Sequence, residues 1–141
     1  MGMHRKILHG MDGSEGSFKA LGEALRLAKL YSAELHTVFV EEMPQYAATV
    51  GEVVEEQASA NEYGREFMAR AQVMAEAEGI PIRTRAIVGH EVKTIVELVK
   101  KKSFDLLVIG FMGRSALYDR VMGSTCSSLV RLAPCSVLVV K

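Results

Sequence analysis

A regular alternation of short apolar segments with longer segments of helical periodicity most constrains the fold of this chain. Parallel strands need crossover connections of helix size, whereas antiparallel strands can be joined by a tight turn. We therefore expect a single α/β domain over residues 1–141, doubly wound, with a five-stranded parallel sheet and helices on both faces. The expected strands are Lys6–Gly10, Glu34–Val40, Ile80–Val88, Asp105–Gly110 and Ser136–Lys141.

The segments between the strands predict four helices. These are Ser14–Ser32, a long helix that ends near Glu78, Glu91–Lys102, and a helix that begins at Gly123, Ser124 and Thr125. Residues from Thr49 to about Asn61 are expected to form a loop that passes into the long helix. Gly79 and Pro81 are typical of residues just beyond a helix C-terminus. Arg83 and Arg85 alternate with less polar residues, which favours an edge position for the third strand.

Composition excludes several classes of function. Lysine plus arginine and aspartate plus glutamate each number 17 in 141 residues, so no overall field draws the chain to nucleic acid or to an anionic membrane. No apolar run approaches the ~20 residues that cross a bilayer. Cys126 and Cys135 lack the spacing of a zinc site or a disulfide framework. We expect a protein of the reducing cytoplasm that binds neither nucleic acid nor membrane.

A glycine motif near the C-terminus predicts an anion site. Gly110 ends a strand, Gly113 follows, and Gly123 with Ser124 opens a helix. Glycines let backbone amides approach a phosphate, and a helix N-terminus offers unpaired N–H groups with the positive end of the dipole behind them. Read singly, these residues fit a tight turn and a helix cap, but together they indicate a nucleotide site. Arg114 is the obvious cation between the glycines, and its alternative is a solvated side chain.

Two further candidates follow the first two strands. In a doubly wound sheet, ligands bind beyond the carboxyl ends of the strands, where the strand order reverses. Asp12 follows the first strand and would accept a ribose hydroxyl or help to hold a divalent ion; its alternative role is an Asx turn. Val40 closes the second strand and would offer an apolar wall to an adenine, or would simply belong to the core.

Motifs for catalysis are missing. The glycines do not form a P-loop, and no base or nucleophile accompanies them. His90 and Glu91 begin like a zinc helix, but Thr94 stands where the second histidine belongs. We therefore expect no catalytic residue, and at most a slow ATPase.

Three segments together resemble the universal stress protein family. They are Met11–Ser17, the glycine motif with its spacing Gly-x2-Gly-x9-Gly-Ser, and the tail Ala133–Val140. The resemblance runs from end to end and is weakest between about Met43 and Gly64.

The resemblance implies a sheet of strand order 3-2-1-4-5, a homodimer through Val137–Val140, and a cytoplasmic stress or signalling role. An apolar last strand at a sheet edge independently favours such pairing. The glycine motif marks the members that bind ATP, with Mg²⁺ or Mn²⁺ as the accompanying ion. By position, Asp12 would contact the ribose or phosphate region and Val40 the adenine. The residues expected at the phosphates are Gly110, Gly113, Gly123 and Ser124, with Thr125 and Arg114 close by.

Three functions remain open at this point. One is an ATP-dependent switch that acts on an unidentified partner protein, the second is an adenine-nucleotide enzyme, and the third is a dimeric interaction module without ligand. Phe111 and Met112 depart from the family, because polar residues often follow the first glycine of the motif.

Overall fold

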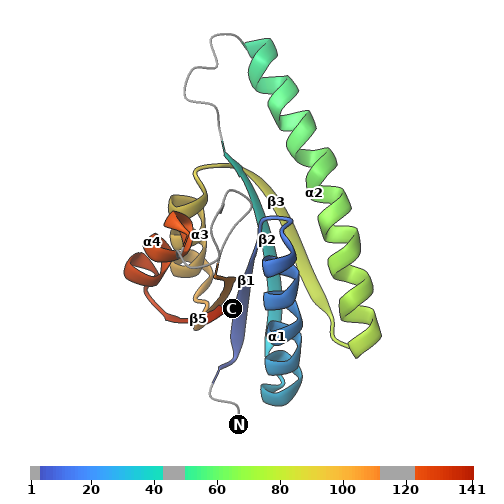
Figure 1. Cartoon of the computed structure of the whole chain (residues 1–141), viewed down its shortest axis with the longest axis vertical. Coiled ribbons are helices and arrows are strands. Elements are labelled where there is room, and N and C mark those ends of the chain that lie inside the picture. The colour runs from blue at the N-terminus through green and yellow to red at the C-terminus, as the bar shows by residue number, and fades with distance from the viewer. Residues whose placement is uncertain (1–3, 43–49, 112–122) are drawn as a thin grey trace.

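A computed structural model of the chain describes residues 4–42, 50–111 and 123–141, with the backbone alone over 50–63. Its five strands form one parallel sheet of order β3-β2-β1-β4-β5 (Figure 1). The expected strand order is therefore confirmed, and so is the edge position of the third strand. The strands are β1 (Lys6–Met11), β2 (Glu34–Glu42), β3 (Ile82–Gly89), β4 (Leu106–Gly110) and β5 (Ser136–Val140).

The helices cover both faces of the sheet, as a doubly wound fold requires (Figure 1). One face packs against α1 and α2, and the other against α3 and α4. Since α1 follows β1 and α4 follows β4, the chain leaves these two neighbouring strands toward opposite faces. The helices are α1 (Glu15–Tyr31), α2 (Val50–Glu78), α3 (Glu91–Lys102) and α4 (Ser124–Leu132).

Some boundaries of strands and helices differ from the expected ones. The strands differ because each extends as far as its neighbour can pair with it. Met11, expected in a turn, pairs with Phe39 as the last residue of β1. β2 continues past Val40 to Glu42, which pairs with Gly89. The loop expected up to about Asn61 is helical from Val50 onward.

The end of α2 follows its sequence signal. Gly79 has a positive φ of 68°. Its N–H donates to the Glu76 carbonyl at 3.0 Å, while the N–H of Ile80 donates to the Ala75 carbonyl at 2.9 Å. This pair of bonds is the Schellman arrangement that a glycine at this position favours.

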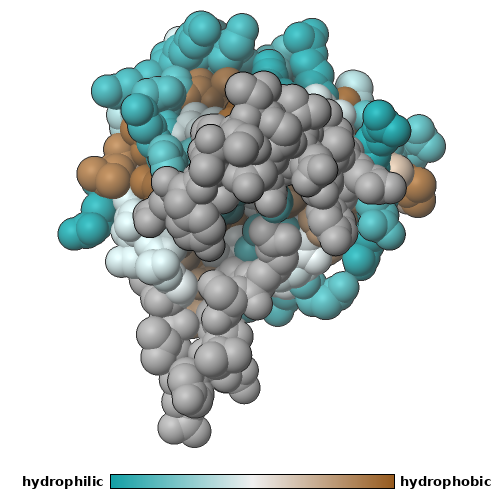
Figure 2. All heavy atoms as spheres, turned by 90° about the horizontal axis from the view of Figure 1, so that it is seen from above, coloured by the Kyte–Doolittle hydropathy of each residue, from teal (hydrophilic) through white to brown (hydrophobic). Residues whose placement is uncertain are grey.

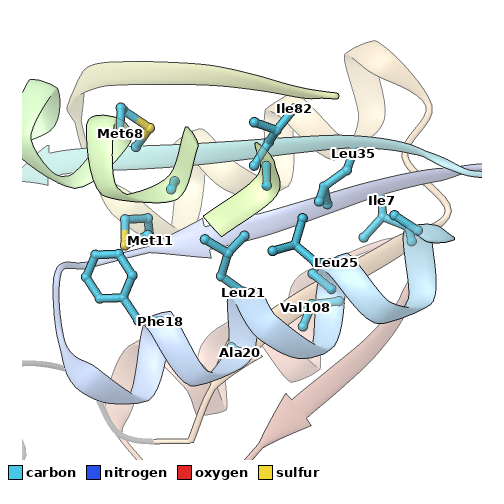
Figure 3. Close-up of a cluster of buried hydrophobic side chains, with 14 of the residues drawn as sticks. Ile7, Met11, Phe18, Ala20, Leu21, Leu25, Leu35, Met68, Ile82 and Val108 are labelled. Atoms are coloured by element: carbon cyan, nitrogen blue, oxygen red, sulfur yellow. The ribbon is translucent and has the colours of Figure 1, made fainter. Parts of the chain in front are cut away.

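Two apolar clusters form the core, one on each face of the sheet. The cluster beneath α1 and α2 includes Leu21, Leu35 and Met68 (Figure 3). The cluster on the opposite face includes Leu107, Ile95 and Leu129. β1 contributes to both, since its successive side chains point to opposite faces. The sheet is thus buried on both sides in its centre.

His9 is a polar residue in this buried centre, with no exposed surface. Its Nε2 lies 2.8 Å from the Ser17 carbonyl, which can only accept, so Nε2 carries the proton. Its Nδ1 then accepts from the Thr37 hydroxyl at 2.7 Å. Burial lowers the pKa of His9 to about 4, against the opposing effects of the Ser17 hydrogen bond and the Asp12 charge. A neutral imidazole therefore joins β1, β2 and α1.

We expect the folded protein to lose stability in acid through His9. Between pH 6.5 and about 4 the unfolded chain binds a proton at His9 that the folded chain does not. Stability therefore falls as the pH falls through this window, by roughly 2 to 3 kcal/mol at pH 4.5 from this group alone. His9→Gln keeps a donor and an acceptor but does not titrate. Urea unfolding at pH 7 and pH 4.5 should show a loss smaller by about that amount in the variant, and equal losses would contradict this role.

Candidate functional site

The candidate site lies at the carboxyl ends of β1 and β4, where the chain departs toward opposite faces of the sheet. Asp12 directly follows β1, and Gly110 is the last residue of β4. Doubly wound sheets bind ligands at such a reversal of strand order. Figure 2 looks onto this end of the molecule, where the described side chains at the rim are mostly hydrophilic. Gly113 and Arg114 lie outside the described residues.

Backbone hydrogen bonds bring the two ends of the glycine motif together. The N–H of Gly123 donates to the Phe111 carbonyl at 3.3 Å, so Gly123 lies beside the residue that follows Gly110. The N–H of Phe111 in turn donates to the Val140 carbonyl at 2.9 Å. The motif is therefore anchored to the end of β5 as well as to β4.

The N-terminus of α4 opens at this point. Gly123 is its N-cap residue and has no side chain to accept a hydrogen bond. The first helical bond runs from the Ser127 N–H to the Gly123 carbonyl at 2.9 Å. Within the described part of the chain, no hydrogen bond uses the N–H groups of Ser124, Thr125 or Cys126. Three backbone donors and the positive end of the helix dipole are thus available to an anion.

Two other helices at the same end of the sheet are capped by their own chain. The Ser14 hydroxyl oxygen accepts from the Ser17 N–H at 3.1 Å and caps α1. The Glu42 carboxylate accepts from the Glu91 N–H at 2.8 Å and caps α3, and it lies 3.5 Å from the His90 ring. A carboxylate at the start of α3 satisfies a donor and repels other anions. Sequence inspection missed this cap, because Glu42 and Glu91 are distant in the chain.

Gly110 is required by packing, whatever binds nearby. A Cβ on Gly110 would lie 3.0 Å from the Gly16 carbonyl carbon and 3.1 Å from its oxygen. The end of β4 therefore contacts the first turn of α1 directly through backbone atoms. Gly110 is not among the residues with positive φ, so the tight turn considered from the sequence is not its explanation.

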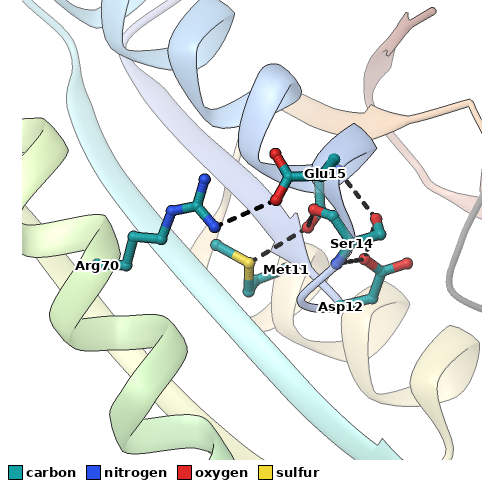
Figure 4. A network of polar contacts seen from close by, with 6 residues as sticks. Met11, Asp12, Ser14, Glu15 and Arg70 are labelled. Carbon is teal, nitrogen blue, oxygen red and sulfur yellow. Dashed lines mark hydrogen bonds and ion pairs between the residues drawn. The ribbon is translucent and has the colours of Figure 1, made fainter.

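Asp12 forms the Asx turn that the sequence offered as its alternative role (Figure 4). Its Oδ1 accepts from the Ser14 N–H at 2.9 Å and from the Ser14 hydroxyl at 2.5 Å. No hydrogen bond among the described residues uses Oδ2, and the side chain is partly exposed. One carboxylate oxygen thus fixes the turn, and the other is available at the carboxyl end of β1.

Val40 does not close its strand, because β2 continues to Glu42. Its side chain is 2% exposed and belongs to the core cluster on the α3 side. β1, however, stops at Met11 opposite Phe39, so β2 extends beyond β1 from Val40 onward. This difference in length leaves a step in the sheet beside Val40.

No group of three metal-binding side chains lies close enough to hold an ion among the residues described. Of the helices in the described ranges, none is long and apolar enough to span a membrane.

Comparison with known proteins decides the family. The sequence model of the universal stress protein family matches residues 3–141. The chain belongs to the universal stress protein family. Universal stress protein MJ0531 of Methanocaldococcus jannaschii is 33% identical over 99% of this chain and 83% of its own length.

Solved universal stress proteins share the fold. The UspA protein of Lactobacillus plantarum is 26% identical, with a TM-score of 0.88 and full coverage of both chains. A universal stress protein solved in complex with cAMP is 27% identical, with a TM-score of 0.73, covering 98% of this chain and 97% of the other. Both the fold and the family expected from the sequence are therefore confirmed.

The packing of Gly110 yields a prediction for this universal stress protein. Gly110→Ala should cost about 1 to 3 kcal/mol, since the added methyl group meets the backbone of Gly16. Gly22→Ala is the matched control, because a Cβ there meets nothing within 4 Å. Gly22 lies inside α1, so this change should stabilise by about 0.5 to 1 kcal/mol. Denaturant unfolding without nucleotide measures both, and a neutral Gly110→Ala would show that the contact is not needed.

Proposed function

We propose that this universal stress protein binds ATP at the carboxyl ends of β1 and β4 and acts as a nucleotide-dependent regulatory switch. The observation that carries the proposal is the open N-terminus of α4, held beside Gly110 by the bond between Gly123 and Phe111. The related protein solved with cAMP supports an adenine nucleotide as the class of ligand.

The phosphates would bind at the start of α4. The N–H groups of Ser124, Thr125 and Cys126 would donate to phosphate oxygens, with Gly123 as a cap without a side chain and the backbone of Gly110 nearby. Gly113 and Arg114 are proposed to complete this cradle. The chain as a whole has equal numbers of acidic and basic residues, so the attraction must come from these local donors.

The nucleoside would lie across the neighbouring strands. Asp12 Oδ2 would accept from a ribose hydroxyl, since Oδ1 is already committed to Ser14. β2 extends beyond β1 from Val40 onward, so its backbone continues past the end of β1, and we propose that the adenine lies there. The Val40 side chain is buried, so it would pack beneath the backbone of β2, and the base would contact this backbone and not the side chain.

Magnesium or manganese would enter with the phosphates. The described residues offer no three-carboxylate or histidine cluster, so phosphate oxygens would supply most ligands, and we propose Asp12 as the ligand from the protein. Because no catalytic group is proposed at this site, we expect hydrolysis to be slow or absent.

The proposed cellular setting follows from the family and the sheet. β5 lies at an edge, and we propose that Val137–Val140 pairs with a second copy of the chain in the cytoplasm. A change in the nucleotide site would reach this edge through the bond between Phe111 and Val140. The partner protein that reads the switch would bind the dimer.

Ser124→Glu tests the phosphate site. A carboxylate in the first turn of α4 should repel phosphate and lower ATP affinity at least tenfold. The free energy of unfolding should stay the same or rise by about 0.3 to 1 kcal/mol, because the helix dipole favours a negative charge there. Ser124→Gln, similar in size and neutral, is the control and should retain more affinity. Calorimetric titration with ATP and thermal unfolding measure the two effects. Equal affinity in both variants would place the phosphates elsewhere.

Purified protein should also carry or bind adenine nucleotide, which extraction followed by chromatography detects. If the protein bound no ATP at millimolar concentration, the proposed switch would be wrong, and the alternative of a dimeric interaction module without ligand would be favoured. Steady release of ADP faster than ~1 s⁻¹ would instead indicate an enzyme.

A further inference from the structure

The ring of Phe67, from α2, lies directly on the turn that follows β1. A Cβ placed on Gly13 would be 2.3, 2.6 and 2.8 Å from Cζ, Cε2 and Cε1 of this ring. Gly13 also has a positive φ of 83°. Both the conformation and the contact therefore require glycine at this position.

Phe67 is itself held by other aromatic rings. It packs edge to face against Phe39, with ring centroids 5.2 Å apart, and against Phe18, with centroids 6.4 Å apart. Edge-to-face pairs at such distances are favourable and restrict how a ring can move. Phe39 immediately precedes Val40, so Phe67 contacts the sheet beside the step as well as the turn.

Arg70, one helical turn after Phe67, makes a second contact with the same region (Figure 4). Its Nη1 lies 3.3 Å from Glu15 Oε1, and its guanidinium carbon lies 3.8 Å from the centre of the Phe18 ring. The ion pair is exposed and contributes little by itself. Together with Phe67 on Gly13, it shows that one face of α2 contacts both the turn and the start of α1.

The contact on Gly13 bears on Asp12 through hydrogen bonds. Gly13 lies between Asp12 and Ser14, and the two hydrogen bonds from Ser14 to Asp12 Oδ1 define the turn. A ring packed against Gly13 restricts movement of the backbone between Asp12 and Ser14. As long as Ser14 donates both hydrogen bonds to Oδ1, the orientation of the Asp12 carboxylate, and with it the position of Oδ2, is fixed.

We propose that Phe67 is a positioning residue of the nucleotide site, which fixes the Asp12 turn and thereby sets the preference for a sugar with free hydroxyls. The inference rests on the proposed binding of ATP for its effect on ligands. Its structural part, the fixing of the turn by Phe67, does not depend on any ligand. α2 thus contributes to recognition without contacting the nucleotide.

Phe67→Leu tests the effect on recognition. The variant stays apolar but lacks the ring that covers Gly13, and Phe67→Met serves if the leucine variant does not fold. Calorimetry compares ATP with 2′,3′-dideoxy-ATP, which lacks the hydroxyls that Asp12 would bind. The wild type should prefer ATP, and the variant should lose this preference by about tenfold or more, the effect of one hydrogen bond to a charged group. Met68→Ala is the control, since Met68 is the next residue of α2 and is buried in the same core.

A merely structural role for Phe67 would weaken both nucleotides alike, as Met68→Ala is expected to do. An unchanged ratio of the two affinities in Phe67→Leu would overturn the proposal.

Amide hydrogen exchange tests the turn without ligand. Phe67→Leu should speed exchange of the Ser14 and Ser17 N–H groups at least tenfold more than that of Leu107, in the centre of the sheet. Equal changes at all three amides would overturn the role of Phe67 in the turn. If the wild type bound no nucleotide, the function proposed above would fail, while the exchange result would still decide whether Phe67 fixes the turn.

Discussion

The parallel pairing of β1 between β2 and β4 is the interaction on which the rest of the structure depends. β1 supplies Ile7 to one apolar cluster and Leu8 to the other, and both are fully buried. Its end sets the position of the Asp12 turn, and its shorter length creates the step beside Val40. The buried His9 joins the same strand to β2 and α1 without introducing a charge. β1 therefore positions the Asp12 turn directly, and it positions the end of β4 at Gly110 through strand pairing.

Much of this arrangement could be predicted from local sequence. The positions of the strands could be predicted from the short apolar segments between the helical ones, because a strand buried on both faces must be apolar along its length. Gly79 marked the end of α2, and the bounds of α3 were predicted as they are found, over Glu91–Lys102. The spacing from Gly110 to Gly123 predicts a phosphate cradle, which stays a prediction; the structure shows that the two ends of this motif are joined through Phe111. The strand order came from the resemblance to a family, since residue patterns alone do not order parallel strands.

Contacts between distant residues could not be predicted. Phe67 on Gly13, Glu42 at the start of α3, and Gly110 against Gly16 all join segments whose proximity only the folded sheet determines. The ends of β2 and β3 were missed for the same reason, because each is set by its neighbour. His9 carries no local signal of burial, and its neutral state depends on Thr37 and Ser17. Gly110 shows that a glycine in a binding motif can have a packing requirement of its own.

The caps on α1 and α3 have a consequence for stoichiometry. Crossover connections in a parallel sheet bring several helix N-termini to one end of the molecule, and each is a potential site for an anion. In the described part of this chain, Ser14 occupies one of them and Glu42 another, while α4 keeps its donors free. The side chains of Ser14 and Glu42 thereby reduce the number of helix N-termini that are open to a phosphate group. Of α1, α3 and α4, only α4 therefore keeps an open N-terminus, so we expect the proposed triphosphate to occupy one of these three helix ends and not several.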